Sequence, residues 1–209
     1  MMRWVLGLVC ASWAGLATAH PHLFVDAEVE LVFENDRLTA VRLVWTYDEF
    51  FSLLLTEDLG IDDDLDGTLT RGELSTLSNA VLDWPEGYVG DLYVTQAGQQ
   101  LQLGARRDAS VAFEDGQIVE SHTRPVEAAP GDVTVKVYDP GYYTAYTVVT
   151  PVTVSGSEAC AAQVTRADLI AATERVDELL YAMPQDQAEM FFPEVGEDFA
   201  DTITVTCGG

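Results

Sequence analysis

Hydrophobic and polar side chains alternate over residues 23–33 (LFVDAEVELVF), with an apolar residue at every second position. This period of two predicts a β-strand with one buried face. A turn at 35–36 separates it from a second alternating stretch at 41–47, so we expect a hairpin. Aromatic residues and leucines then cluster over 48–58, and their spacing predicts a short helix.

A second helix is expected at about 73–83, and the chain after it is a series of short apolar stretches separated by turn residues. The predicted strands lie at 88–95, 99–104, 109–114, 117–125, 133–138 and 143–154. Many short strands with regular turns are typical of a β-sandwich. A further helix from Thr165 to about Met183 and a last strand near Ile203 and Val205 complete the pattern.

The predicted fold is mostly β, in the α+β class, with sandwich-like antiparallel sheets and one C-terminal helix. We expect a sandwich domain at 20–160, interrupted by a helix-loop-helix insertion at about 48–83. Residues 161–209 are expected to pack a helix and a strand on the same domain. A chain of 209 residues with 48% hydrophobic residues is long enough for such a core.

The first 19 residues have the pattern of a cleavable secretory signal. Arg3 precedes an apolar run, which ends in the small-residue sequence Ala17-Thr18-Ala19. The run is short for a membrane span. We therefore expect a periplasmic protein that begins at His20 after cleavage and has no membrane span.

The chain is strongly acidic, with 35 Asp and Glu residues against 10 Lys and Arg and a net charge of −25. Phosphate groups would be repelled, which argues against nucleic acid and against an anionic membrane surface as partners. Metal cations are the partners that this charge favours. A solvated acidic surface is the alternative interpretation for many of these residues.

Residues 62–73 (DDDLDGTLTRGE) match the spacing of an EF-hand calcium loop. The expected ligands are the side chains of Asp62, Asp64, Asp66 and Glu73 and the backbone carbonyl of Thr68. Gly67 occupies the position where the backbone turns sharply. Calcium prefers six to eight oxygen ligands, and clustered carboxylates repel one another without a cation. Thr70 and Glu73 also form a capping box for the second helix.

Two features depart from the EF-hand pattern, and the lack of a second loop argues against a calcium sensor. Leu65 is apolar at a loop position where a polar residue is usual, and no second loop of this kind follows, although sensor EF-hands work in pairs. The alternative is a solvated acidic turn without an ion. With calcium bound, the loop would make the inserted helix-loop-helix rigid.

The chain has three histidines, and two of them begin the expected mature protein as His20-Pro21-His22. A terminal amine and an imidazole suit copper, nickel or zinc. A square-planar copper or nickel site that uses the amide nitrogen of the second residue is blocked, because Pro21 has no N–H. His122 is a candidate third ligand for such a transition metal. Alternatively, His20 and His22 are the polar start of a strand.

Cys160 and Cys207 are the two cysteines of the expected mature chain, and an oxidising compartment allows a disulfide between them. The alternative is two buried thiols. A group of tyrosines could form a ligand platform or pack a strand edge: Tyr138, Tyr142, Tyr143 and Tyr146. No phosphate loop or nucleophile arrangement stands out in the sequence, so we do not expect an enzyme.

Several segments resemble the domain-of-unknown-function family numbered 1007. They are the acidic loop and the stretches at 20–27 (HPHLFVDA), 44–52 (VWTYDEFFS) and 137–143 (VYDPGYY). Members of this family are exported bacterial proteins labelled as periplasmic components of an uncharacterised ABC-type transport system. The resemblance, with an expected link to nickel, cobalt or zinc transport genes, implies a metal-handling accessory role. The chain is short for a solute-binding component and has no pair of α/β lobes.

Two functional hypotheses follow. The first is a periplasmic accessory protein of nickel, cobalt, zinc or copper transport or homeostasis, with one structural calcium and a possible membrane metal transporter as partner. The second is a calcium-stabilised β-sandwich interaction module. It would dock to an envelope or transporter partner without binding a transition metal.

Overall fold

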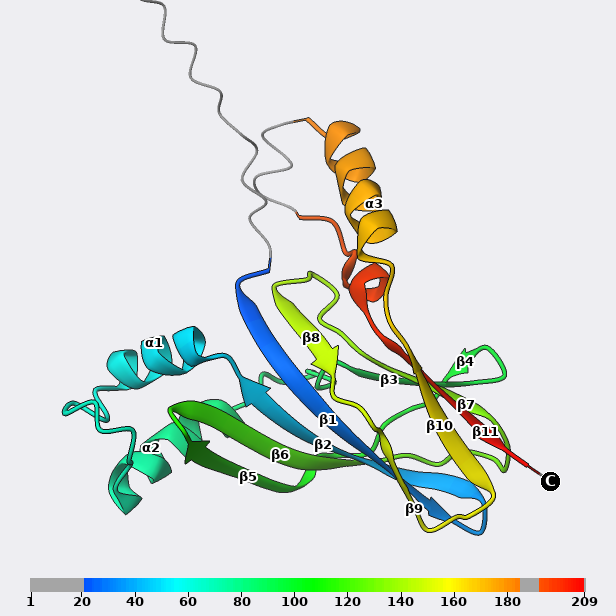
Figure 1. Ribbon diagram of the computed structural model, residues 1–209, viewed down its shortest axis with the longest axis horizontal. Coiled ribbons are helices and arrows are strands. Elements are labelled where there is room, and N and C mark those ends of the chain that lie inside the picture. Colours follow the sequence, from blue (N-terminus) through cyan, green and yellow to red (C-terminus); the bar gives the residue numbers. More distant parts are fainter. Residues whose placement is uncertain (1–20, 185–191, 209) are drawn as a thin grey trace, which may run out of the picture.

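The structure, a computed structural model, describes residues 21–184 and 192–208. The expected signal segment at 1–19 and His20 lie outside these residues. The described chain forms two β-sheets and three α-helices and is mostly β, as the hydrophobic pattern predicts (Figure 1). None of the described helices has both the length and the hydropathy needed to cross a bilayer.

The first sheet has the strand order β5-β6-β2-β1-β8, and β9 also pairs with β1. Its strands are β1 (Leu23–Glu34), β2 (Arg37–Tyr47), β5 (Arg107–Glu114), β6 (Gln117–Pro125), β8 (Thr144–Val148) and β9 (Thr153–Ser155). The hairpin of β1 and β2 is confirmed, with Val25 opposite Tyr47. Asn35 and Asp36 form its turn with positive φ angles of 51° and 57°, which Asn and Asp tolerate better than other side chains.

The strand predicted over 143–154 is in fact two strands, β8 and β9. Both run parallel to β1, so the first sheet is mixed and the expectation of purely antiparallel sheets is wrong for it. The interruption contains Pro151, whose nitrogen has no hydrogen to donate to a neighbouring strand.

The second sheet is antiparallel and has the order β10-β11-β7-β3-β4. Its strands are β3 (Leu92–Gln96), β4 (Gln99–Gln100), β7 (Val133–Val137), β10 (Cys160–Thr165) and β11 (Thr202–Cys207). The predicted last strand is confirmed as β11. No strand was predicted at β10, whose sequence CAAQVT has few of the large apolar residues that mark a buried strand.

The main core lies between the two sheets and contains inward-facing residues of both (Figure 1). Its largest enclosed side chains are Trp45, Phe33, Leu31, Leu38, Leu43, Leu92 and Ile203. Burial of each such side chain contributes about 1.5–3 kcal/mol.

Helices α1 (Glu49–Leu59) and α2 (Arg71–Leu82) form the predicted insertion between β2 and β3. A second, smaller core holds them against the first sheet through Ile61, Leu77 and Ile118. In Figure 1 they lie at one end of that sheet, beside β5 and β6. The acidic loop that connects them is therefore anchored on both sides.

Helix α3 (Leu169–Tyr181) is shorter than predicted and projects from the sandwich (Figure 1). Its N-cap is Asp168, whose carboxylate accepts the N–H groups of Ile170 and Ala171. Thr165 instead belongs to β10. Near the end of the chain, a short 3-10 helix at Gly196–Phe199, η1, precedes β11.

Candidate functional site

Local sequence signals fix both helices that flank the acidic loop. The carboxylate of Asp48 accepts the N–H of Phe51 at 2.8 Å and caps the start of α1. Gly60 ends α1 in the left-handed conformation, where a side chain would be strained. Thr70 caps the start of α2. The loop is thus held between two well-defined helix ends.

Three aspartates of the loop come together. Carboxylate oxygens of Asp62, Asp64 and Asp66 all lie within 4.8 Å of one another. Asp62 is only 6% exposed, and its buried Oδ1 has no hydrogen-bond partner among the residues that the structure describes. Asp64 and Asp66 are exposed. Such a group of oxygens can coordinate a hard cation, which would relieve the mutual repulsion of the carboxylates.

Glu73 lies at the other end of the loop. Its Oε2 accepts the N–H of Thr70 at 2.8 Å, and the Thr70 hydroxyl accepts the Glu73 N–H at 3.4 Å, so the predicted capping box is confirmed. The hydroxyl and the N–H of Thr70 hold the pKa of Glu73 below its ordinary value. Oε1 accepts the N–H of Asp62 at 3.3 Å. Glu73 is outside the set of oxygens within 4.8 Å and bonds to the loop backbone instead.

The loop backbone has an unusual conformation at three positions. Gly67 has a φ of 73°, which suits the turn position that the calcium-loop pattern assigns to it. Asp62 and Leu65 also have positive φ, at 55° and 53°. Thr68, predicted to bind calcium through its carbonyl, donates its N–H to Asp66 Oδ1 at 2.7 Å and so lies against the aspartates.

The structure does not bring the two described histidines together. His22 precedes β1, with its N–H bonded to the Tyr143 carbonyl at 2.9 Å and its ring 4.9 Å from the Tyr143 ring. His122 lies on β6, opposite Leu43 of β2, which is in turn opposite Val29 of β1. Seven residues along β1 and two strand spacings therefore separate the two histidines by more than about 20 Å.

A buried polar cluster, which no motif in the sequence predicts, surrounds Glu120. Its carboxylate is fully enclosed and accepts hydrogen bonds from Tyr47 Oη at 3.1 Å and Arg106 at 3.4 Å. Arg106 also donates to the carbonyl of Leu82, the last residue of α2, at 2.6 Å. The cluster therefore ties the end of α2 to the first sheet.

His122 belongs to this cluster rather than to a metal site with His22. Its ring meets those of Trp45 and Trp84 edge-on, at centroid distances of 4.7 and 5.0 Å. Its Nδ1 lies 3.3 Å from Glu120 Oε1, and neither ring nitrogen has a hydrogen-bond partner among the described residues. Alternation along β6 could have revealed this burial, because Ile118 marks the inward face on which Glu120 and His122 also lie.

The four tyrosines do not form a common platform. Tyr138 stacks on Tyr93 and Tyr142 on Phe199, at centroid distances of 4.0 and 3.8 Å. Tyr146 is half-buried and donates its hydroxyl proton to Asp91 Oδ2 at 2.9 Å. Burial raises the pKa of Asp91 to about 6.

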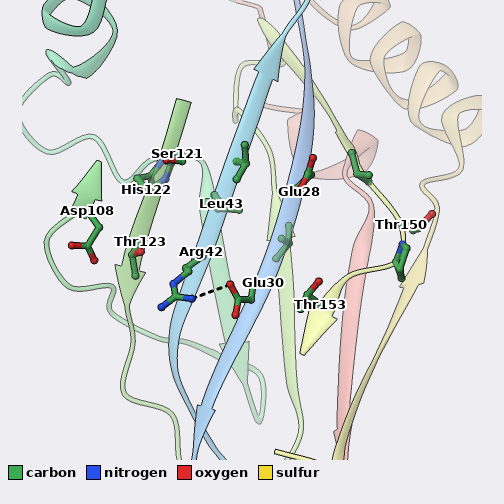
Figure 2. Close-up of a pocket in the computed structure, with 14 residues that line it drawn as sticks. Glu28, Glu30, Arg42, Leu43, Asp108, Ser121, His122, Thr123, Thr150 and Thr153 are labelled. Atoms are coloured by element: carbon green, nitrogen blue, oxygen red, sulfur yellow. Dashed lines mark hydrogen bonds and ion pairs between the residues drawn. The ribbon is translucent and has the colours of Figure 1, made fainter. Parts of the chain in front are cut away.

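The outer face of the first sheet carries an open groove of about 730 Å³. Figure 2 shows Glu28, Glu30 and Arg42 on its floor, with Arg42 paired to Glu30 at 3.1 Å. His122 borders the groove only through its strand, since its side chain is on the buried face. Among the described residues that line the groove, no nucleophile is paired with a base.

The predicted disulfide between Cys160 and Cys207 is present. It joins residues that are directly opposite on β10 and β11. It therefore fixes the last strand to the edge of the second sheet, close to the end of the chain.

Together these features describe a β-rich, disulfide-linked protein of two sheets with an EF-hand-like insertion. The family model described as "Protein of unknown function (DUF1007)" matches residues 5–207. The chain belongs to this family, as the sequence motifs indicate. A comparison with curated proteins finds no match.

Proposed function

We propose that this protein is an exported, calcium-stabilised interaction module whose β-sandwich holds the α1–α2 insertion in place for a partner in the cell envelope. The observation that carries the calcium proposal is the buried, unpartnered Oδ1 of Asp62 beside the carboxylates of Asp64 and Asp66. A buried carboxylate oxygen without a partner is costly, and a bound cation would compensate that cost.

Glu73 is compatible with this site although it bonds to the backbone. Each carboxylate oxygen has two lone pairs, so Glu73 can keep its N–H partners while it contributes an oxygen to calcium. The bond from Asp62 N–H to Glu73 holds the two ends of the loop close together. Calcium would then link α1 to α2 and stabilise the insertion.

Thermal unfolding with calcium, magnesium or a chelator tests the proposal. At a hundredfold excess over Kd, binding to the folded state alone contributes about 2.7 kcal/mol. For a protein of this size the expected rise in Tm is about 5–10 °C. The Asp62→Asn variant should show no rise. An equal rise in that variant, or none in the wild type, would contradict the proposal.

Transition-metal handling in nickel, cobalt, zinc or copper transport remains a separate proposal. It is supported by the ligand chemistry of His20-Pro21-His22 and by the position of His22 just before β1, near the expected processed terminus. Given its enclosure and distance, His122 is not part of this site. Metal titration of protein that begins at His20 tests it, with the double variant His20→Ala, His22→Ala as comparison. Equal affinities would rule it out.

A further inference from the structure

Helix α1 packs with its small polar residues inward. Ser52 and Thr56 are 0% and 2% exposed, and the partly buried Phe51, Leu55 and Leu59 of the same helix pack against the small core of the insertion. The Ser52 hydroxyl accepts the backbone N–H of Ile118 on β6 at 3.0 Å. This contact requires the helix to approach the strand closely, and small side chains at the interface allow it.

The opposite face of α1 carries large apolar side chains. Phe50, Leu53 and Leu54 are 67%, 42% and 46% exposed. Positions three and four apart lie on one side of a helix, so these residues form one stripe. Figure 1 shows α1 at an edge of the molecule, and no element of the described chain covers this stripe. Leaving three neighbouring large apolar residues in water is typical of an interaction surface.

Acidic residues surround the stripe. Glu49, Glu57 and Asp58 are exposed on α1, which has no lysine or arginine, and the acidic loop follows directly. A second copy of this chain would bring like charges together, and an anionic membrane would be repelled in the same way. The charge and the apolar stripe together fit a partner that combines apolar anchors with basic side chains.

We propose that the outward face of α1 docks a basic amphipathic helix of a partner protein, with Phe50, Leu53 and Leu54 as anchors. This rests on the proposed interaction function and names the surface and the partner chemistry for it. A helix can present apolar residues at the same three- and four-residue spacing, with lysine or arginine beside them to face the acidic rim.

Fluorescence anisotropy with a labelled amphipathic helical peptide of leucine and lysine tests the docking. The wild type should bind it, and the double variant Phe50→Ser, Leu54→Ser should bind about tenfold or more weakly. The matched control is Leu169→Ser, Ile170→Ser on α3, where both residues are also exposed. This control should bind like the wild type.

Two further peptides separate docking from simple charge attraction. A shuffled leucine and lysine peptide without a helical stripe, and a leucine and glutamate peptide with one, should both bind much more weakly. Equal binding of the shuffled peptide, or equal loss in both double variants, would overturn the proposal. Preferential binding of neutral phosphatidylcholine vesicles through the stripe would overturn it in favour of a membrane.

A charge variant keeps the test decisive if the serine variant fails to fold. The double variant Glu57→Lys, Asp58→Lys should bind the lysine peptide more weakly and the glutamate peptide more tightly than the wild type does. Unchanged binding of either peptide would contradict docking on α1. Each titration is run with calcium and with chelator, alongside the Tm. A calcium-dependent Tm without peptide binding would refute this docking while leaving the calcium proposal intact.

Discussion

The backbone N–H of Asp62 donates a hydrogen bond to Oε1 of Glu73, at 3.3 Å, and so joins the first and last positions of the acidic loop. Glu73 also starts α2 through its capping box with Thr70. The conformation of the loop and the start of the helix are therefore coupled. A change at either end should affect both the cation site and the packing of the insertion.

Relief of backbone strain at Leu65 should stabilise the protein. This residue is 65% exposed and has a φ of 53°, a conformation that costs a leucine about 1–2 kcal/mol. Asparagine tolerates it better, so Leu65→Asn should raise the free energy of unfolding by about 1 kcal/mol in denaturant titrations. Leu65→Ala, which keeps the strain, should give no such gain. Equal behaviour of the two variants would count against strain at this position.

Loss of the disulfide should cost considerable stability. The bridge between Cys160 and Cys207 spans 47 residues, and a loop of that length corresponds to about 4 kcal/mol in the chain-entropy model. The double variant Cys160→Ala, Cys207→Ala should therefore unfold at lower urea concentration. Reducing agent should shift the wild type equally and leave the variant unchanged. A reducing agent without effect on the wild type would contradict this prediction.

The pKa of Asp91 predicts a pH dependence of stability. Burial raises it from 3.8 to about 6, so the folded protein holds this proton more tightly than the unfolded chain. The Asp91 contribution to stability is present at low pH and is lost as pH rises from about 4 to about 6. Asp91→Asn removes this dependence. As the pH rises across that range, the unfolding free energy of the variant should increase by up to about 3 kcal/mol relative to that of the wild type.

The quantity to compare is the slope of the unfolding free energy against pH, because Asp91→Asn also changes the hydrogen bond from Tyr146. Urea titrations at several pH values measure it for both proteins. Parallel pH profiles of the two proteins would show that Asp91 has no raised pKa.

Breaking the buried ion pair of Glu120 should be strongly destabilising. Glu120→Gln removes the charge that compensates Arg106, whose side chain is only 18% exposed. Removal of one partner from a buried pair costs about 3–5 kcal/mol. Glu30→Gln is the matched control, since its pair with Arg42 is solvent-exposed, and it should cost less than about 1 kcal/mol. Similar decreases in unfolding free energy in both variants would show that burial of Glu120 does not make its ion pair more important for stability.

Alternation and helix-capping signals predicted most of the fold. The hairpin of β1 and β2, the insertion and β11 all follow from patterns that span a few residues. The parallel pairing of β8 and β9 with β1 could not be derived in this way, because it depends on which strands meet in space.

In the candidate site, too, local patterns could be predicted from the sequence and long-range contacts could not. The aspartates of the acidic loop are neighbours in sequence, so their spacing predicted their proximity. The cluster of Glu120, Arg106 and Tyr47 joins residues that are far apart in the chain and could be found only from the fold. The sequence offers His122 only as a candidate third ligand, and its position on the inward face of β6 places it far from His22.

Calorimetric titration of calcium into chelator-treated protein tests directly whether the acidic loop binds this ion. The matched pair of variants is Asp62→Asn, which alters the buried carboxylate, and Asp63→Asn, which alters an exposed neighbour outside the cluster. We predict a single calcium site per chain in the wild type and in Asp63→Asn, and none in Asp62→Asn. Absence of binding in the wild type, or equal binding in both variants, would contradict it.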